Sequence, residues 1–569
     1  MGSINLNYRM LLRVSIWFLS VFLSCNSERG EHQHQEHHQS KVDELVRQTA
    51  LDNQSDTTVN TLIKKEKPTY PIILNDLLGI NAFEWDFLQD PNRPSEPGLN
   101  IYEPKMRLIK SFSGVRHYLD WEKLEDHPGS YTFNPTRRGG WNYDTIYRRC
   151  KEEGIFVVTC IQTTPDWLYN TYPEKERSHD NIPAPYGADR ENPASYLAQA
   201  KAAFQFAARY GSNGKVDRSL VHVNDTARWN TDRINEVKIG LDLVHYVECG
   251  NEPDKWWKGN GVQQNGRQYA ANLSAFYDGH KGTLGKDVGV KSADPTMKVV
   301  MGGLARANVA FIKDMIAWCK EHRGYKKDGH VDLCFDILNY HLYSNDNLSW
   351  FSKLFKSASH GIAPELSNLG EVADSFVHLS NELGGMPVWS TEVGYDLDSK
   401  SLQRAIPIGS KSAEMVQADW LIRTALLYGR HGVDKVFFYQ LYDNDASNIP
   451  SGMAFGKSGL LAPGKRRVAA DYFVQLRKLM GNYQYVHTVE DDPIVDVYQN
   501  DHKKMYVLVV PDQQDRKENY TLNVKEAKQV KIHYLRPKAD VMETETRAIQ
   551  NGRIKLLVTE TPIFVEAAG

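Results

Sequence analysis

The stretch "LVHYVECGNE", residues 243 to 252, is an apolar run that ends on a carboxylate. Continuous apolar runs of this length are typical of strands buried on both faces of a parallel sheet. Pro253 follows directly. A proline lacks the backbone donor and biases the residue before it towards an extended conformation. We therefore expect a buried strand that stops here, with Glu252 extended at its rim.

Seven further apolar runs occur along the chain, and amphipathic segments separate them. Eight buried strands that alternate with helices predict an α/β fold, a closed (β/α)8 TIM barrel, over residues 71–480. A doubly wound open sheet is the competing architecture, but no G-x-G-x-x-G motif follows the first run. The other runs are 76–83, 113–121, 154–163, 297–305, 335–343, 387–395 and 433–442, and the clearest helical segments are 194–211, 308–322, 412–432 and 466–481.

Residues 481–569 have a different pattern. Short runs such as "KKMYVLVVP", "VKIHYLRP", "RIKLLVTE" and "PIFVEA" are separated by polar turns. This pattern predicts a small all-β sandwich domain behind the barrel. Its role is either structural or carbohydrate binding.

The N-terminus has the pattern of an export signal. Arg9 and Arg13 precede the apolar run 14–23, which has the length of a signal-peptide core and ends in "FLSC". This pattern resembles the lipobox of bacterial lipoproteins, although Phe22 stands where that pattern prefers Leu. The resemblance implies residues 1–25 as a signal peptide, lipid on Cys25, and an exported protein anchored in a bacterial membrane, the outer membrane in our interpretation. An ordinary secretory signal is the alternative.

Residues 26–70 are polar and include "EHQHQEHHQS" at 31–40. They are interpreted as a solvated His-rich tether, with metal binding by the histidines as the alternative. The five other cysteines show no C-x-x-C spacing, so we expect buried thiols and neither a disulfide framework nor a zinc site. They are Cys150, Cys160, Cys249, Cys319 and Cys334.

The composition is that of a globular protein, with 41% hydrophobic and 24% charged residues among 569. A formal net charge of -3 gives no basic field and argues against nucleic acid as a partner. The 12 Trp and 29 Tyr residues offer flat faces that suit sugar rings. Nothing in the sequence indicates the oligomeric state.

Two glutamates end predicted strands. Glu392 ends the run "PVWSTEVGY" (387–395) as Glu252 ends its own, and these are the seventh and fourth strands. The carboxyl ends of barrel strands carry the active site, so the two would face each other across the mouth. Glycoside hydrolysis needs such a pair, one carboxyl protonated and the other ionised. Alone, each glutamate could equally be a surface residue after a strand.

"GNEP" after the fourth strand and "STEVGY" at the seventh resemble motifs of the clan A glycoside hydrolases. Within that clan, the single barrel with a trailing β module looks most similar to family 39 and its relatives. The resemblance covers residues 71–480. It implies that Glu252 is the acid/base, that Asn251 binds the sugar 2-hydroxyl, and that Glu392 is the nucleophile of a retaining double displacement.

Three further residues match the same resemblance. Arg116 in "GVRHYLDW" lies on the second strand, where the clan often has an arginine that keeps the nucleophile ionised. "NYHLY" supplies His341 and Tyr343, which resemble the clan's substrate-contacting His-x-Tyr. A guanidinium near Glu392 would lower its pKa, whereas burial beside another carboxylate would raise that of Glu252. A structural ion pair for Arg116 and core polar roles for His341 and Tyr343 remain alternatives.

Several aromatic residues follow predicted strands and are candidates for stacking on sugars, with structural packing as the alternative. Many clan members end strand eight with a tryptophan, but this chain has "FFYQLYDND" (437–445), so other side chains would have to serve there. The candidate substrate-binding residues of this group are Trp85, Trp167, Trp256, Trp257, Tyr439 and Gln440.

Two weaker patterns lie near the same rim. "YDNDASN" (442–448) has oxygen ligands suited to a structural calcium ion but lacks the EF-hand spacing. Five basic residues could contact sulfate or uronate groups, or be scattered surface charges. They are Arg137, Arg138, Lys255, Lys258 and Arg306.

Taken together, these patterns predict a retaining glycoside hydrolase that acts on a poly- or oligosaccharide, with no metal or redox cofactor in its chemistry. The alternative from another class is a glycan-binding surface lipoprotein on the same barrel. An esterase or lyase is a third possibility, and no G-x-S-x-G elbow supports an esterase.

Overall fold

The computed structural model describes residues 72–93, 98, 100–227, 234–346, 359–443, 455–501, 503–524 and 527–568. The predicted signal peptide with Cys25, the polar tether, and residues 444–448 of the candidate calcium segment lie outside these residues. Among the helices that the structure describes, none is both long and apolar enough to cross a membrane.

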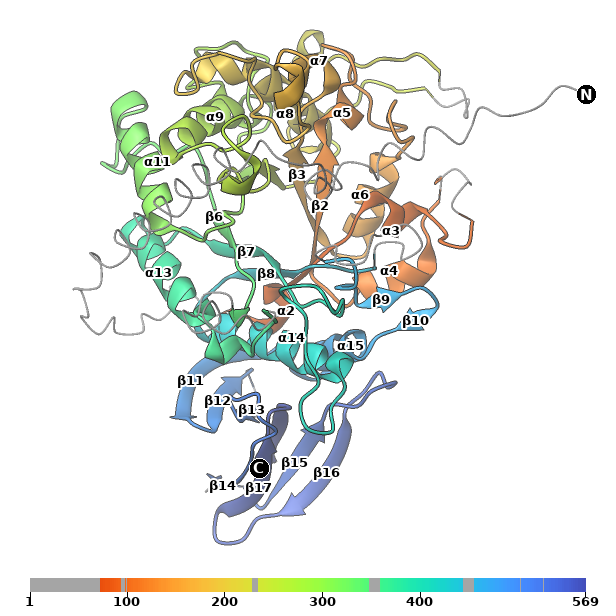
Figure 1. Ribbon diagram of the computed structural model, residues 1–569, viewed down its shortest axis with the longest axis vertical. Coiled ribbons are helices and arrows are strands. Elements are labelled where there is room, and N and C mark those ends of the chain that lie inside the picture. The colour runs from red at the N-terminus through yellow and green to blue at the C-terminus, as the bar shows by residue number, and fades with distance from the viewer. Residues whose placement is uncertain are drawn as a thin grey trace, which may run out of the picture. The chain divides into compact units, whose positions relative to one another are not determined.

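Eight parallel strands form the predicted barrel (Figure 1). Their order is β5-β4-β3-β2-β1-β8-β7-β6, and parallel bridges Val300–Ile337 and Leu304–Tyr340 join the two ends and close the sheet. The (β/α)8 prediction is therefore confirmed, and the open doubly wound alternative is wrong. The strands are β1 (Leu78–Asn81), β2 (Gly114–Asp120), β3 (Phe156–Gln162), β4 (Tyr246–Cys249), β5 (Lys298–Met301), β6 (Leu338–His341), β7 (Val388–Val393) and β8 (Lys435–Phe438).

Helices surround the barrel and lie between its strands along the chain (Figure 1). The four segments predicted as amphipathic form α8, α11, α14 and α15. The helices are α2 (Leu74–Leu77), α3 (Glu84–Leu88), α4 (Glu103–Ile109), α5 (Trp121–Leu124), α6 (Tyr143–Glu152), α7 (Asp166–Tyr169), α8 (Leu197–Tyr210), α9 (Gly266–Asp278), α10 (Val290–Ala293), α11 (Val309–His322), α13 (Leu369–Glu382), α14 (Ala413–Arg430) and α15 (Val468–Met480).

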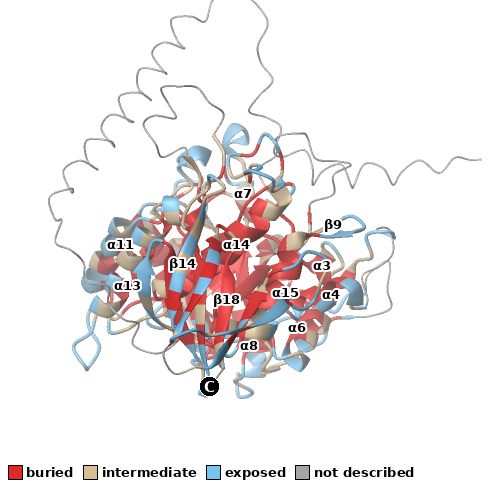
Figure 2. Cartoon of the chain, turned by 90° about the horizontal axis from the view of Figure 1, so that it is seen from below, coloured by how far each residue is buried: buried red, intermediate tan, exposed pale blue. Residues whose placement is uncertain are grey.

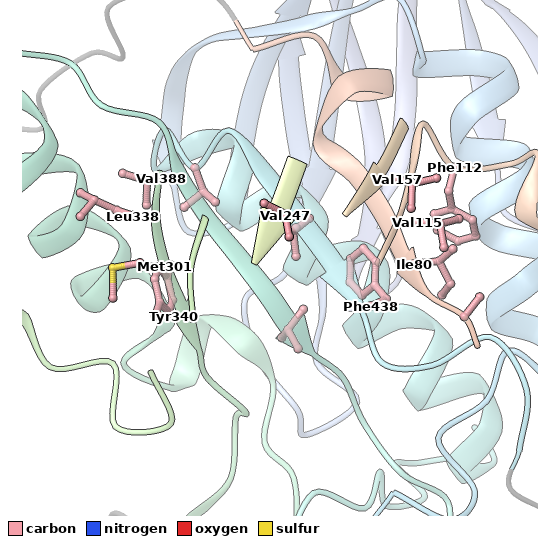
Figure 3. Packing of buried hydrophobic residues seen from close by; sticks show 14 of the residues in the cluster. Ile80, Phe112, Val115, Val157, Val247, Met301, Leu338, Tyr340, Val388 and Phe438 are labelled. Atoms are coloured by element: carbon pink, nitrogen blue, oxygen red, sulfur yellow. The ribbon is translucent and has the colours of Figure 1, made fainter. Parts of the chain in front are cut away.

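Side chains alternate between two cores along each strand, as the pleat requires. On β2, Val115 belongs to the large cluster between strands and helices, which also includes Val157 and Val247 (Figure 3). A second cluster fills the barrel interior with Val158, Val300, Ile337, Trp389 and Phe437. Since this apolar plug fills the interior, the polar chemistry is confined to the mouth.

The C-terminal residues form the predicted β-sandwich. Six antiparallel strands, in the order β11-β12-β13-β18-β15-β16, make one sheet, and β14 pairs with β17 in the other. A separate apolar core, including Val495, Leu508, Ile532 and Leu556, joins them. The strands are β11 (Gln484–Asp491), β12 (Ile494–Gln499), β13 (Lys504–Val509), β14 (Lys517–Asn523), β15 (Gln529–Tyr534), β16 (Glu543–Ala548), β17 (Arg553–Thr559) and β18 (Ile563–Ala568), and a short hairpin of β9 (Leu461–Ala462) and β10 (Lys465–Arg466) precedes α15.

Helix α14 lies between the barrel and the sandwich, and its residues 416–429 are all buried (Figure 2). Burying charged side chains in such a helix is costly unless they are paired. Arg430 forms an ion pair with Asp496 of β12 at 2.8 Å, and the Nη1 atom of Arg423 donates to the carbonyl oxygen of Asp512 at 3.0 Å. These contacts give the sandwich a fixed attachment to the barrel.

Candidate active site

Glu392 is brought to the barrel mouth by an irregularity in β7. The register between β6 and β7 shifts so that Tyr340 pairs with Ser390 but His341 pairs with Glu392, and the pairing with β8 shifts over the same residues. Strict alternation would send Thr391 and Glu392 to opposite faces. Instead, the Nε2 atom of His341 lies 2.9 Å from Thr391 Oγ1, and its Nδ1 atom lies 3.7 Å from Glu392 Oε2. Such a bulge redirects a side chain, as often occurs near active sites.

Arg116 uses all five of its guanidinium donors in the mouth. Its Nη1 atom donates to Glu392 Oε1 at 2.9 Å, and its Nη2 atom donates to Asn251 Oδ1 at 2.9 Å. The other bonds go to Asn81 and, in a bidentate pair, to Glu248. Arg116 and Glu248 are completely buried. The arginine is thus both a structural ion pair and a direct partner of the predicted nucleophile.

Two tyrosine hydroxyls complete the surroundings of Glu392. Tyr118 donates to Oε1, and Tyr343 donates to Oε2 at 3.0 Å. Burial would by itself raise the pKa of Glu392, but His341, Arg116 and the two hydroxyls outweigh burial and hold that pKa below its ordinary value. Glu392 is therefore ionised under ordinary conditions, as a nucleophile must be.

Glu252 has a different backbone conformation from the one expected. Strand β4 ends at Cys249, three residues earlier, and the backbone φ of Glu252 is +50°. Because this is the left-handed region, the expectation of an extended Glu252 before Pro253 was wrong. Gly250 also has a positive φ, of 74°. The chain therefore turns sharply after β4, and tertiary contacts hold Glu252 in a conformation uncommon for residues other than glycine.

His341 connects the two glutamates. Its Nδ1 atom lies 3.0 Å from Glu252 Oε1, and one ligand atom from each of Glu252, His341 and Glu392 lies within 4.8 Å of the others. Burial alone would lower the pKa of His341, but Glu392 and Glu252 together raise it. The Glu252 side chain is 16% exposed and that of Glu392 7%, so the first carboxylate is closer to solvent than the second.

The predicted tryptophans fall into two groups. Trp256 and Trp257 lie in a short 3-10 turn after Glu252 and are 43% and 51% exposed, with their ring centroids 4.6 Å apart. Trp85 stacks on Phe83 at 4.8 Å, and the Nε1 atom of Trp167 donates to the carbonyl oxygen of Glu125. Trp256 and Trp257 are thus exposed to a ligand, whereas Trp167 is partly engaged in packing.

Tyr439 and Gln440 follow β8 and are joined by a cis peptide bond. The ring of Tyr439 lies 6.2 Å from that of Phe83 and 5.5 Å from that of Phe455. Gln440 is buried, and its Nε2 atom donates to the carbonyl oxygen of Phe455 at 3.2 Å. Its Oε1 atom has no hydrogen-bond partner among the described residues. These two side chains close the side of the mouth where the sequence has no tryptophan.

A polar cavity of about 50 Å³ lies beside Glu252. Its lining includes Gln162, Asn251, Glu252, Lys255 and Asp180. Asp180 pairs with both Lys255 and Lys258, each at 2.8 Å. The cavity thus provides polar space next to the carboxylate at the mouth.

Among the residues that the structure describes, two clusters could in principle hold a metal ion, since in each the ligand atoms lie within 4.8 Å of one another. One is Glu252, His341 and Glu392, and the other is Glu122, Asp166 and His179. In the second cluster Arg138 already pairs with both carboxylates, at 2.7 and 2.6 Å. This arginine takes the place that a cation would need.

Several residues in contact with the site were missed from sequence, among them Tyr118, Glu248, Asn81 and Thr391. Tyr118 lies two residues after Arg116 on β2, and Glu248 lies four residues before Glu252. The period of two along β2 could have identified Tyr118, since alternate residues share a face. The same alternation applies to Glu248 on β4. In the sequence, however, a single charged residue inside an apolar run gives no indication of this role.

The eight-stranded barrel carries Glu252 on the turn after β4 and Glu392 near the end of β7. No protein-family model matches the chain, and no curated protein matches its sequence. Among solved structures, a family 39 glycoside hydrolase from the gut symbiont Bacteroides cellulosilyticus is similar, with a TM-score of 0.55 and 17% identity over 87% of this chain and 81% of that one.

Two further solved structures match with lower TM-scores. A family 30 endoxylanase from Clostridium papyrosolvens has a TM-score of 0.46 and 12% identity over 89% of this chain and 98% of its own. A family 44 xyloglucanase from Paenibacillus polymyxa, solved with xyloglucan, has a TM-score of 0.46 and 10% identity over 88% and 98%. The expected structural relationship to clan A is thus confirmed by the family 39 structure, as a likeness of fold.

Proposed function

We propose that this protein is a retaining glycoside hydrolase of a poly- or oligosaccharide, with Glu392 as nucleophile and Glu252 as acid/base. The observation that carries the proposal is the pair of carboxylates joined through His341, with oxygens within 4.8 Å of each other. Retaining enzymes place the two carboxyl groups about 5–5.5 Å apart, whereas inverting enzymes leave about 6.5–9.5 Å for a water. The short separation supports direct attack by Glu392.

In the first step a Glu392 oxygen bonds to the anomeric carbon while the bond to the leaving oxygen breaks, and Glu252 gives its proton to that oxygen. In the second step Glu252 takes a proton from water, the water oxygen bonds to the anomeric carbon, and Glu392 leaves as a carboxylate. Arg116, Tyr118 and Tyr343 orient Glu392 and stabilise its charge in the free enzyme. We propose that Asn251, held by Arg116, contacts the sugar 2-hydroxyl.

These steps need only side chains of the chain and water, so we propose that neither a metal ion nor a redox cofactor takes part. Export is also a proposal, supported by the run 14–23 and by Cys25 at the end of "FLSC". On this proposal the enzyme is held at a membrane by its lipid, and the polar residues 26–70 separate the barrel from the bilayer.

The test is hydrolysis by the purified protein on plant, algal and host polysaccharides, beside Glu252→Gln and Glu392→Gln, with reducing ends as the readout. Wild type should release sugars and neither variant should. Glu545→Gln, an exposed carboxylate on β16, is the matched control and should keep full activity. Equal glycan binding by all proteins with no release would instead identify a glycan-binding protein.

A further inference from the structure

Arg306 differs from the other basic residues near the barrel mouth in what it contacts. Its side chain is exposed, and no carboxylate among the described residues lies within ion-pair distance of it. The other four basic residues of the predicted rim all pair with acids: Arg137 with Asp126, Arg138 with Glu122 and Asp166, and Lys255 and Lys258 with Asp180.

The guanidinium of Arg306 lies over the indole of Trp256, 4.2 Å from the ring centroid. A cation held on an aromatic face in this way keeps its orientation. The planar guanidinium can then present its N–H groups to an anion while one face stays on the ring. Trp257 stands at 87° to Trp256, and both indoles are exposed. We call Trp256, Trp257 and Arg306 the tryptophan–arginine platform.

The platform is tied to the segment that carries Glu252. The backbone N–H groups of Ala305 and Arg306 donate to the two carboxylate oxygens of Asp254 at 2.9 and 3.0 Å. Asp254 is buried and follows Glu252 by two residues. The loop after β5 and the turn after β4 are therefore fixed to each other, on the side of the mouth from which Glu252 acts.

We propose that the tryptophan–arginine platform binds an anionic substituent, a carboxylate or a sulfate ester, on the leaving-group part of the glycan. The inference rests on the proposed function, in which Glu252 protonates the leaving group. Trp256 and Trp257 follow Glu252 in the chain and therefore lie on the leaving-group side in this proposal. Exposed indoles stack on pyranose faces, and a guanidinium binds carboxylate or sulfate through two parallel hydrogen bonds. Arg306 makes these bonds because its charge is not already paired.

The experiment uses the full chain with Glu392→Gln, which keeps the platform and stops turnover. Binding is measured by calorimetry to two matched pairs of ligands: a uronate-containing polysaccharide and its carboxyl-reduced form, and a sulfated polysaccharide and its desulfated form. One acidic form should bind at least about tenfold more tightly than its neutral form. The pair that shows this preference identifies the anion.

Adding Arg306→Gln should abolish the preference while leaving the neutral form's affinity within about twofold. Arg137→Gln is the matched control, because it removes one exposed rim charge that is already paired with Asp126. The inference is overturned if neither acidic form binds more tightly, or if Arg306→Gln and Arg137→Gln behave alike on every ligand.

Hydrolysis by the protein with Glu392 intact separates this inference from the proposed function. Release from a neutral glycan with no effect of Arg306→Gln on any substrate would leave the hydrolase in place and remove the platform. Binding that depends on Arg306, with no release from any glycan, would overturn the hydrolase and with it the leaving-group assignment. Faster hydrolysis of the acidic form that is lost in Arg306→Gln would support both the hydrolase and the tryptophan–arginine platform.

Discussion

Arg116 and Glu392 form an ion pair inside the barrel, with Nη1 of the arginine 2.9 Å from Oε1 of the glutamate and neither side chain more than 7% exposed. The arginine cannot turn away, because its remaining donors are bound to Glu248, Asn81 and Asn251. Removing one partner of a buried pair leaves the other charge without compensation. On the proposed function, the pH dependence of hydrolysis should report directly on this contact.

Arg116→Lys is expected to lower kcat/KM by roughly 10²-fold, the loss typical of a misplaced catalytic group. Lysine keeps the charge but lacks the planar guanidinium, so it cannot donate hydrogen bonds to Glu392 and Asn251 at the same time. The pKa of Glu392 should rise, and the acid limb of the kcat/KM profile should move to higher pH. Arg137→Lys is the control and should change neither kcat/KM nor the position of the acid limb. An unmoved acid limb would contradict the role of Arg116 in ionising Glu392.

Glu248→Gln is expected to move the same acid limb in the opposite direction. Removing this buried negative charge leaves the charge of Arg116 less compensated, which lowers the pKa of Glu392 further. A pH profile over the acid range, with Arg116→Lys alongside, measures both shifts. If Glu248 only supports the fold, activity will fall with no change in the limb.

Tyr118→Phe and Tyr343→Phe each remove one donor from Glu392. Hydrogen bonds to charged groups contribute about 1.5–3 kcal/mol, so each variant should lose roughly tenfold to a hundredfold in kcat/KM. Each should also raise the pKa of Glu392, and the acid limb should move to higher pH. Tyr498→Phe is the matched control, since its buried hydroxyl has no hydrogen-bond partner among the described residues. Equal effects from all three variants would contradict the assignment.

Asp496→Asn is expected to destabilise the protein by about 3–5 kcal/mol, because it leaves the buried guanidinium of Arg430 without its counter-charge. The readout is the urea midpoint of unfolding. Glu545→Gln breaks the exposed pair with Arg547 and should cost at most about 1 kcal/mol. Similar midpoints for the two variants would mean that the Arg430 contact does not hold the sandwich to the barrel.

The sequence alone determined the architecture of the barrel. Each of the eight apolar runs became a strand, because a strand covered by helices on one face and an apolar plug on the other must be apolar throughout. The same rule located Glu252 and Glu392, since charged residues at the ends of such strands lie where the barrel opens. The place of Arg116 on the second strand came from the resemblance to the clan A motifs.

The tertiary structure alone decided how these groups meet. The register shift in β7, the positive φ of Glu252 and the fixed guanidinium of Arg116 all come from contacts between strands far apart in the chain. Local propensity specifies neither a bulge against two neighbouring strands nor the pairing of a buried carboxylate such as Glu248. The two glutamates, Arg116, His341 and Tyr343 at the mouth could thus be predicted from sequence, whereas Tyr118 and Glu248, and the protonation and spacing of the whole group, depend on packing across the closed barrel.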